Sequence, residues 1–219
     1  MTIWLSWSSG KDCAWALHRL RQDGCEVSAL FTTINEAADR VAMHGVRREL
    51  LLKQAHAAGL PLHIIPLPWP CTNAQYEQIM AAFLKQAQSA GVTNMAFGDL
   101  FLDDIRDYRV RNLANTGIEP LFPVWGIPTA KLANEMLSAG LRARLATVDL
   151  AKLDQSFAGR NFDNALLADL PEGIDPCGEN GEFHTFVTQG PMFRGSVEVA
   201  VGKTVVRDGF AFADLVLAG

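Results

Sequence analysis

Alternating strand and helix patterns constrain the fold of this chain more than any other feature. Residues 3–7 form a short apolar and aromatic segment, typical of a buried strand, that runs directly into a cluster of serine and glycine. Apolar residues between 13 and 20 then repeat at helical spacing, and Gly24 stands where a helix end favours a left-handed residue. A second strand is predicted over residues 27–31. Together these segments have the size of one βαβ unit.

The same alternation continues to about residue 150. Further helices are predicted over residues 46–58, 73–90 and 129–139, and further strands over residues 62–65, 94–97 and 141–148. This pattern predicts a three-layer α/β/α, Rossmann-like fold with a mainly parallel sheet. After about residue 160 the composition changes, and short strands are predicted over residues 196–201 and 204–206. We therefore predict a nucleotide-binding α/β domain of residues 1–150 and a smaller α+β region of residues 151–219, β-rich at its end.

The composition excludes several classes of protein. A net charge of −5 over 219 residues provides no general basic surface, so no nucleic-acid partner is expected, although Arg47, Arg48 and Lys53 could form a local basic face on one helix. No apolar run approaches the ~20 residues that span a bilayer, and no secretory signal is apparent. We expect a cytoplasmic protein without a membrane partner. The four cysteines lie too far apart for a zinc knuckle or a dithiol motif.

The loop Ser8-Ser9-Gly10-Lys11-Asp12-Cys13 joins the first predicted strand to the first predicted helix. In doubly wound folds this turn directs backbone N–H groups and a helix N-terminus to one point, which suits phosphate. Small residues allow close approach of the backbone, and Lys11 adds a positive charge. Asp12 would either cap the loop or reach phosphate through Mg²⁺. A solvent-exposed helix cap with a turn glycine is the simpler alternative, and the spacing is not that of a Walker loop.

The loop resembles the Ser-Gly-Gly-Lys-Asp-Ser signature of the pyrophosphate-loop ATPases. It departs from that signature twice, at Ser9 and at Cys13. Ser9 raises the cost of a positive φ angle where the signature has glycine. Cys13 removes one hydroxyl from the pyrophosphate cradle. The resemblance implies that residues 8–13 bind ATP.

Three further segments extend the resemblance along nearly the whole chain. They are Gly98-Asp99-Leu100 with Arg109, residues 119–126 (EPLFPVWG) and residues 175–185 (DPCGENGEFHT). With the loop, they resemble the diphthine-ammonia ligase family, which also has a bacterial branch described as a domain of unknown function. The resemblance implies a domain of the adenine nucleotide α-hydrolase type followed by a smaller substrate-side domain. Known members join ammonia to a carboxylate of diphthine at the expense of ATP.

The segment 175–185 places Glu179, Glu182 and His184 within six residues among glycines. In an extended stretch Glu182 and His184 share one face. Two carboxylates and an imidazole could position an amine, accept its proton or hold Mg²⁺. The alternative is a loop whose polar groups only fix a turn. The resemblance favours a substrate-binding and catalytic role for these three residues together with Lys11.

Other residues are assigned to the nucleotide site by position or resemblance. Gly98 and Asp99 end a predicted strand at the ligand edge of the sheet; Asp99 could bind ribose, Mg²⁺ or a basic partner, or cap the helix that begins near Asp103. Arg109 could stabilise developing phosphate charge or pair with Asp104 or Asp107 on a helix face. His44 could cover the nucleotide or form an ordinary turn before a helix. Cys177 shows no feature of a nucleophile.

The implied reaction begins when a carboxylate attacks the α-phosphate of ATP, after which ammonia displaces AMP. The carboxylate could belong to a small molecule or to a protein, and family members resembling the eukaryotic ligases usually carry Glu where this chain has His184. Diphthine occurs on an elongation factor of archaea and eukaryotes, so a bacterial member would need another acceptor. A sulfur-inserting or tRNA-modifying enzyme and a nucleotide-binding regulatory module stay open, as does a homodimer.

Overall fold

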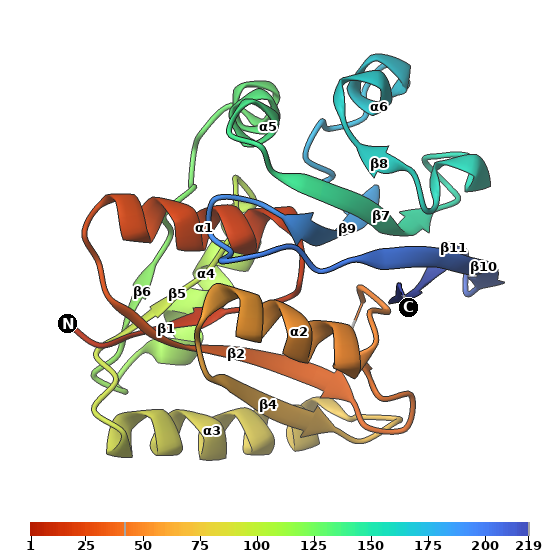
Figure 1. Ribbon diagram of the computed structural model, residues 1–219. Helices are drawn as coiled ribbons and strands as arrows, with labels where there is room; N and C mark the ends of the chain where they lie inside the picture. The colour runs from red at the N-terminus through yellow and green to blue at the C-terminus, as the bar shows by residue number, and fades with distance from the viewer. Residues whose placement is uncertain (42, 219) are drawn as a thin grey trace.

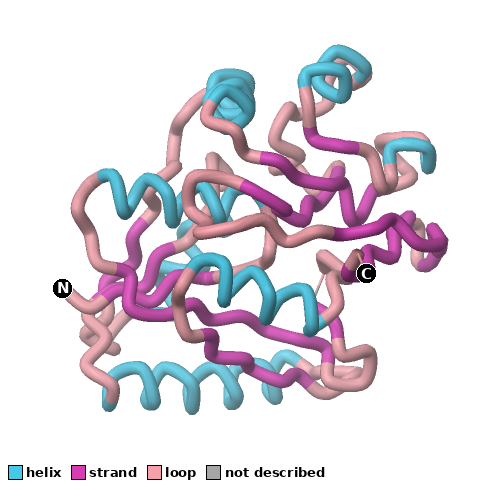
Figure 2. Tube along the Cα trace, in the orientation of Figure 1, coloured by secondary structure: helices cyan, strands magenta, loops and turns pink. Residues whose placement is uncertain are grey.

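The computed structural model describes residues 1–41 and 43–218, which form two β-sheets with helices around them (Figures 1 and 2). The first sheet has the strand order β3-β2-β1-β5-β6, and β4 pairs with β2. All its pairings are parallel except that of β3 with β2. Its strands are β1 (Ile3–Ser6), β2 (Val27–Asn35), β3 (Arg40–Val41), β4 (Leu62–Leu67), β5 (Asn94–Ala96) and β6 (Glu119–Leu121). The mainly parallel α/β architecture predicted from sequence is confirmed.

Helices cover both faces of this sheet. α3 (Asn73–Ser89) lies below it in Figure 1, whereas α1 (Lys11–Gln22) and α2 (Arg48–Ala58) lie above it, between the two sheets. α4 (Asp103–Leu113) contributes Leu113 to the same buried cluster as α3. Side-chain alternation in β1 explains this. Trp4 is buried in the cluster on the α3 side, while Ile3 and Leu5 are buried in the larger cluster that includes α1, α2 and the second sheet.

The second sheet is wholly antiparallel and has the order β10-β11-β7-β8, with β9 also paired to β7. Its elements are β7 (Arg142–Asp149), β8 (Asn161–Phe162), β9 (Phe183–Gln189), β10 (Val199–Arg207) and β11 (Phe210–Leu217), with helices α5 (Thr129–Ser138) and α6 (Asn164–Asp169) and a 3₁₀ turn, η1 (Gln155–Phe157). β7 matches the strand predicted over residues 141–148 but lies in this sheet. A buried apolar run does not reveal its partners, because strands in either type of sheet can be covered on both faces. The domain boundary at residue 150 stays a prediction.

The end of the chain is β-rich, as expected, but the strand limits differ. The two predicted strands at 196–201 and 204–206 are one strand, β10, with an irregularity between Val201 and Thr204. β11 follows after Asp208 and Gly209, whose φ angles are 53° and 82°. Asp-Gly is a strong signal for a two-residue hairpin turn, and it could have revealed this hairpin. Over the described residues, no helix combines the length and apolar character needed to cross a membrane.

One buried side chain fixes the loop after β1 against the second sheet. Gln54 of α2 accepts a hydrogen bond from Trp7 Nε1 at 3.0 Å and donates to the carbonyl oxygens of Ser9 and Val187 at 3.1 and 2.6 Å. The backbone of β9 adds a direct bond, from Val187 N to Ser9 O at 3.0 Å. The position of the loop therefore depends on both sheets.

Candidate active site

The loop that joins β1 to α1 has the backbone conformation that its resemblance implies. Ser9 is fully buried and has a φ angle of 74°, so serine occupies a left-handed conformation that glycine adopts more easily. Gly10 is the residue before α1, with φ and ψ of −82° and 169°. The N–H of Lys11 donates to Thr185 Oγ1 at 3.0 Å. The first turn of α1 is thus held by a side chain of β9.

Cys13 forms hydrogen bonds with two other residues of the same loop. Its thiol donates to Gly10 O at 3.1 Å and accepts from Ser8 Oγ at 3.4 Å. The side chain is buried, and burial raises the pKa of the thiol to about 11. The thiol is therefore a packed, protonated group, so the substitution for serine changes the polarity of the loop without adding a nucleophile.

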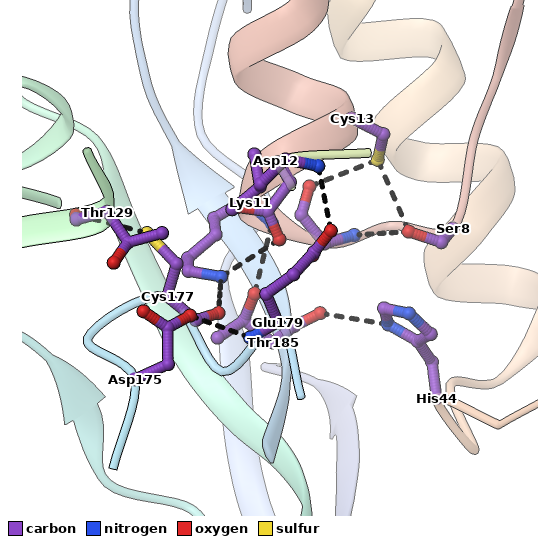
Figure 3. A network of polar contacts seen from close by, with 12 residues as sticks. Ser8, Lys11, Asp12, Cys13, His44, Thr129, Asp175, Cys177, Glu179 and Thr185 are labelled. Atoms are coloured by element: carbon purple, nitrogen blue, oxygen red, sulfur yellow. Dashed lines mark hydrogen bonds and ion pairs between the residues drawn. The ribbon is translucent and has the colours of Figure 1, made fainter. Parts of the chain in front are cut away.

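Lys11 lies at the junction of the two halves of the molecule (Figure 3). Its ammonium donates to Asp12 Oδ2 at 2.9 Å and to the carbonyl oxygen of Cys177, and it lies 5.7 and 5.5 Å from the ring centres of Phe162 and Phe183. Only 2% of the residue is exposed. Burial opposes the charge and is the largest single effect, but the combined attraction of Asp12, Cys177 and Glu179 outweighs it and raises the pKa of Lys11. The loop thus carries a fixed positive charge.

Two polar atoms of the loop have no hydrogen-bond partner within the described chain, although they are buried: Ser9 Oγ and Asp12 Oδ1. Buried polar atoms are nearly always paired, so these two suit contact with a bound group. Asp12 does not cap α1, because the cap residue is Gly10 and no side-chain cap bond is made. Burial raises the pKa of Asp12 despite the opposing effect of Lys11. Its free oxygen fits a cation ligand, although no group of three His, Cys, Asp or Glu among the described residues could hold a metal alone.

Gly98 allows the segment after β5 to touch the loop directly. A Cβ atom at this position would lie 2.7 Å from Cys13 N and 2.8 Å from Asp12 C, which are both backbone atoms. Only glycine fits such an approach without displacement of the chain. The close approach to the start of α1 therefore gives a steric reason for glycine at position 98.

Asp99 and Arg109 form an ion pair, with Arg109 Nε 3.3 Å from Asp99 Oδ2. Asp99 does not cap the helix near Asp103, because the cap residue of α4 is Leu102. The guanidinium of Arg109 also lies 4.8 Å from the ring centre of Phe97. Both members of the pair line the main cavity, and of the alternatives for Asp99 the structure shows the basic partner.

The glycine-rich loop before β9 directs Glu179 toward the start of α4. Glu179 Oε1 accepts from Leu100 N at 2.7 Å, and Glu179 N donates to Asp175 Oδ2 at 2.8 Å. Burial raises the pKa of Glu179 to about 7, although the bond from Leu100 opposes the shift. Near neutral pH this carboxyl group can therefore either hold or release a proton.

Glu182 and His184 have different surroundings. Glu182 is buried, and its Oε1 accepts from Asp175 N at 3.2 Å and from Asn180 Nδ2 at 3.1 Å. These bonds fix the turn, and Glu182 is not among the residues that line the main cavity, whereas His184 is. The sequence predicts that the two residues share one face of an extended segment. They do not line the same cavity, because β9 begins at Phe183 and Glu182 lies before the strand.

His44 reaches the same cavity from the N-terminal half. Its ring stacks on His184 with centres 4.4 Å apart, and His44 Nδ1 lies 3.4 Å from Thr185 O. Burial lowers the pKa of His184 to about 4 and lowers that of His44 well below its ordinary value, and His184 adds to the shift in His44. Both imidazoles are therefore neutral near pH 7.

Most of these groups surround one cavity of about 570 Å³ at the carboxyl ends of the parallel strands. Its walls include most of the predicted site residues: Ser8, Lys11, Asp12, Cys13, His44, Gly98, Asp99, Arg109, Glu179 and His184. Ser9, Gly10 and Glu182 lie behind this surface and shape the loops. The cavity has the size of a small-ligand site.

Known proteins match the chain over both halves. The model for the diphthamide synthase N-terminal domain matches residues 1–117, and that for the diphthamide synthase C-terminal domain matches residues 128–214. The chain belongs to the diphthamide synthase family. A zebrafish (Danio rerio) diphthine–ammonia ligase is 29% identical over 73% of this chain and 68% of its own length. The human protein of the same name is 26% identical over 65% of the chain and 55% of its length, and the rat (Rattus norvegicus) protein is 22% identical over 94% and 85%.

The two family domains both contribute residues to the cavity. Residues 8–13 and His44 belong to the segment matched by the N-terminal domain, whereas Glu179 and His184 belong to that matched by the C-terminal domain. Sequence reasoning missed Thr185, which holds α1, and Asp175, which holds Glu179. Their polarity inside the motif was the available signal, but the contacts of Thr185 link residues far apart in sequence.

Proposed function

We propose that this protein is an ATP-dependent ligase that forms AMP and pyrophosphate and joins ammonia to a carboxylate. The observation that carries the proposal is the meeting of the loop of residues 8–13 with the loop before β9 around one cavity, where Lys11 of the first loop bonds to Cys177 of the second and to Thr185 of β9. The named activity of the zebrafish and human relatives supports the same reaction class.

In the proposed first step, an oxygen of the acceptor carboxylate attacks the α-phosphorus of ATP, and the bond to pyrophosphate breaks. The N-terminal end of α1 and the Lys11 ammonium stabilise the negative charge of the departing pyrophosphate. Lys11 is buried, so this charge acts where water screens it little. Asp12 lines the cavity and its Oδ1 has no hydrogen-bond partner within the described residues, so this atom is suited to a Mg²⁺ ion. When bound, Mg²⁺ would neutralise phosphate charge, and phosphate oxygens would have to complete its coordination.

In the second step, the nitrogen of ammonia attacks the acyl carbon and AMP leaves. Ammonium must first lose a proton, and the product amide requires loss of a second. Glu179, with a pKa of about 7, is a better acceptor for these protons than His184, with a pKa of about 4. We therefore assign proton transfer to Glu179 and binding of the acceptor or the amine to neutral His184, with Glu182 as the residue that fixes their loop.

Two alternative functions fit the site less well. A sulfur-inserting enzyme needs a reactive cysteine, but burial raises the pKa of both Cys13 and Cys177 near the loop. A tRNA-modifying enzyme needs a basic surface, which a net charge of −5 does not favour. A regulatory nucleotide-binding module does not account for Glu179, a carboxyl group beside the loop whose pKa is raised to about 7. A cytoplasmic location, a homodimer and the absence of a nucleic-acid partner stay predictions.

The test follows radiolabelled ATP with a panel of carboxylic acids and ammonium. AMP and pyrophosphate that appear only with an acid and ammonium together support the ligase, whereas ADP and phosphate, or tight binding without products, contradict it. Lys11→Ala should abolish product formation, because it removes the charge beside the pyrophosphate. Lys131→Ala is the matched control and should retain activity, because Lys131 is exposed on α5 and, among the described residues, its ion pair is with Glu135.

A further inference from the structure

The segment of residues 119–126 is one of the sequence motifs, but it lies outside the main cavity. The structure describes every residue of this segment, and none of them is among the residues that line the cavity. Its start forms β6, which pairs with β5, and residues 122–126 form a turn in which Val124 is fully buried. The segment therefore acts on the site only through the residues that it contacts.

The 122–126 turn is bonded to the segment that follows β5. Gly126 N donates to Leu100 O at 2.8 Å. Leu100 N in turn donates to Glu179 Oε1 at 2.7 Å. Both backbone groups of the fully buried Leu100 are thus paired, one with the turn and one with the carboxyl group that lines the cavity.

Aromatic and cationic side chains hold the turn in place. The ring of Phe122 stacks on that of Phe97, which directly follows β5, and it meets the ring of Trp125 edge-on; both pairs of ring centres are 5.9 Å apart. The guanidinium of Arg106, from α4, lies 5.4 Å from the ring centre of Phe122 and 4.8 Å from that of Trp125. The turn is therefore packed against both elements between which Leu100 lies in the chain.

Gly126 has a backbone conformation that other residues avoid. Its φ angle is 72°, and a Cβ atom at this position would meet nothing within 4 Å. Glycine is therefore favoured here by the backbone angle and not by lack of space. A β-branched residue is strongly disfavoured at such an angle, so it should alter the turn without a steric clash.

The backbone and the side chain of Glu179 are held by different parts of the molecule. Asp175, in the same loop, accepts from Glu179 N at 2.8 Å, whereas the carboxyl group is held by Leu100. Leu100 fixes one oxygen, Oε1, and thereby sets the direction of the other. The direction of the carboxyl group thus depends on a backbone that the 122–126 turn supports.

We propose that the 122–126 turn is a positioning element for Glu179, because it fixes the backbone at Leu100, whose N–H group sets the place of the Glu179 carboxyl group in the cavity. The consequence for catalysis rests on the proton transfer assigned to Glu179 in the ligase function proposed above. The contact itself does not depend on that function, so the two can be tested separately.

The amide proton of Leu100 reports on this contact without any turnover. A proton in a short hydrogen bond to a carboxylate is shifted to low field in NMR spectra, and this bond is 2.7 Å long. Glu179→Ala, which removes the acceptor, provides the reference signal of the unbonded amide. Gly126→Val should move the Leu100 signal most of the way toward that reference. A wild-type Leu100 signal in Gly126→Val overturns the proposal.

Gly117→Val is the matched control for this substitution. Gly117 has a φ angle of 73° and open space at its Cβ position, but it lies before β6, at the end of that strand away from the turn. This variant should leave the Leu100 signal unchanged. An equal displacement in Gly117→Val overturns the proposal, because general strain around β6 would then explain the effect.

A second variant decides the question if Gly126→Val does not fold. Trp125→Ala removes a ring that packs on Phe122 and Arg106, so it should move the Leu100 signal in the same direction. Trp69→Ala, which removes a 72% exposed ring elsewhere, should leave the signal unchanged. A wild-type signal in Trp125→Ala overturns the proposal.

Turnover separates the positioning role from the ligase function. With an acid that supports AMP formation, Gly126→Val should lower kcat about tenfold or more and leave the KM for ATP unchanged, because Lys11 keeps its bond to Thr185. A fall in kcat with a wild-type Leu100 signal overturns the proposal. A displaced signal with wild-type kcat refutes proton transfer by Glu179 and keeps the contact. If no acid yields AMP with the wild type, the ligase is refuted and the Leu100 signal alone decides the positioning role.

Discussion

Replacement of Gly98 by alanine tests whether close contact between β5 and α1 sets the position of the nucleotide loop. The new Cβ atom would lie 2.7 Å from Cys13 N, and ordinary van der Waals contact begins near 3.4 Å, so the two segments must move apart by about 0.7 Å. The obstructing atoms belong to the backbone, so a side-chain rotation cannot relieve the clash. Overpacking of this kind typically costs about 1–3 kcal/mol of unfolding free energy.

The displacement acts on the first turn of α1, where Lys11 and Asp12 lie. A shift near 1 Å at a reacting centre reduces rates by about 10²-fold. We therefore expect Gly98→Ala to lower the urea midpoint moderately and to reduce AMP formation by about two orders of magnitude. Urea unfolding and labelled-ATP turnover measure the two effects separately.

Gly195 provides the matched control for this substitution. A Cβ atom there would meet nothing within 4 Å, and the residue does not have a positive φ angle. Gly195→Ala should therefore leave both stability and turnover unchanged. Wild-type stability together with wild-type turnover in Gly98→Ala would refute the reasoning, because the loop would then tolerate the displacement.

Three further substitutions have defined outcomes. Glu179 must be ionised to accept a proton, so turnover should rise with pH through about 7, and Glu179→Gln should be slow and lack that rise in a pH–rate profile. The pKa of Asp214 is lowered to about 2, chiefly by its hydrogen bonds to Arg47, so the ionised carboxylate stabilises the fold at pH values above the ordinary carboxyl pKa. This contribution disappears as the pH falls toward 2. Asp214→Asn should therefore lower the free energy of unfolding by about 1–2 kcal/mol at pH 7 in urea unfolding, and by less in high salt. Gln54→Leu leaves Trp7 Nε1 and two carbonyl oxygens without their partner, so it should cost about 2–4 kcal/mol in the same assay.

Each of these expectations can fail in a recognisable way. A rise in turnover near pH 7 that persists in Glu179→Gln would assign the titration to another group. Equal stability of Asp214→Asn and wild type at low salt would show that the ion pairs of Asp214 with Arg40 and Arg47 do not stabilise the fold. Wild-type stability in Gln54→Leu would mean that the partners of Gln54 find other hydrogen bonds. Gln88→Leu, at an exposed position of α3, is a matched control for the last variant.

Local patterns predicted much of the first sheet. The apolar segments that became β1, β2, β4 and β5 and the helical spacing of α1, α2 and α3 depend on neighbours in sequence, so they can be read from it. The sequence pattern did not predict β6, because this strand is three residues long and contains Pro120. Proline suits an edge strand, which is the position of β6 in the sheet. Strand β7 was predicted, but its partners β8, β9 and β11 all come from later in the chain.

The sequence by itself determined that a strand, a small polar loop with Lys11 and a helix follow one another, because hydrophobic period and turn residues act over a few positions. It also marked Ser9 as a residue under backbone strain, which its φ angle of 74° bears out. Only the tertiary structure decided which groups face one another. Thr185 lies 174 residues from Lys11, and His184 of β9 stacks on His44, which lies in the turn between β3 and α2. Such contacts depend on how the two sheets pack, and no local pattern contains that information.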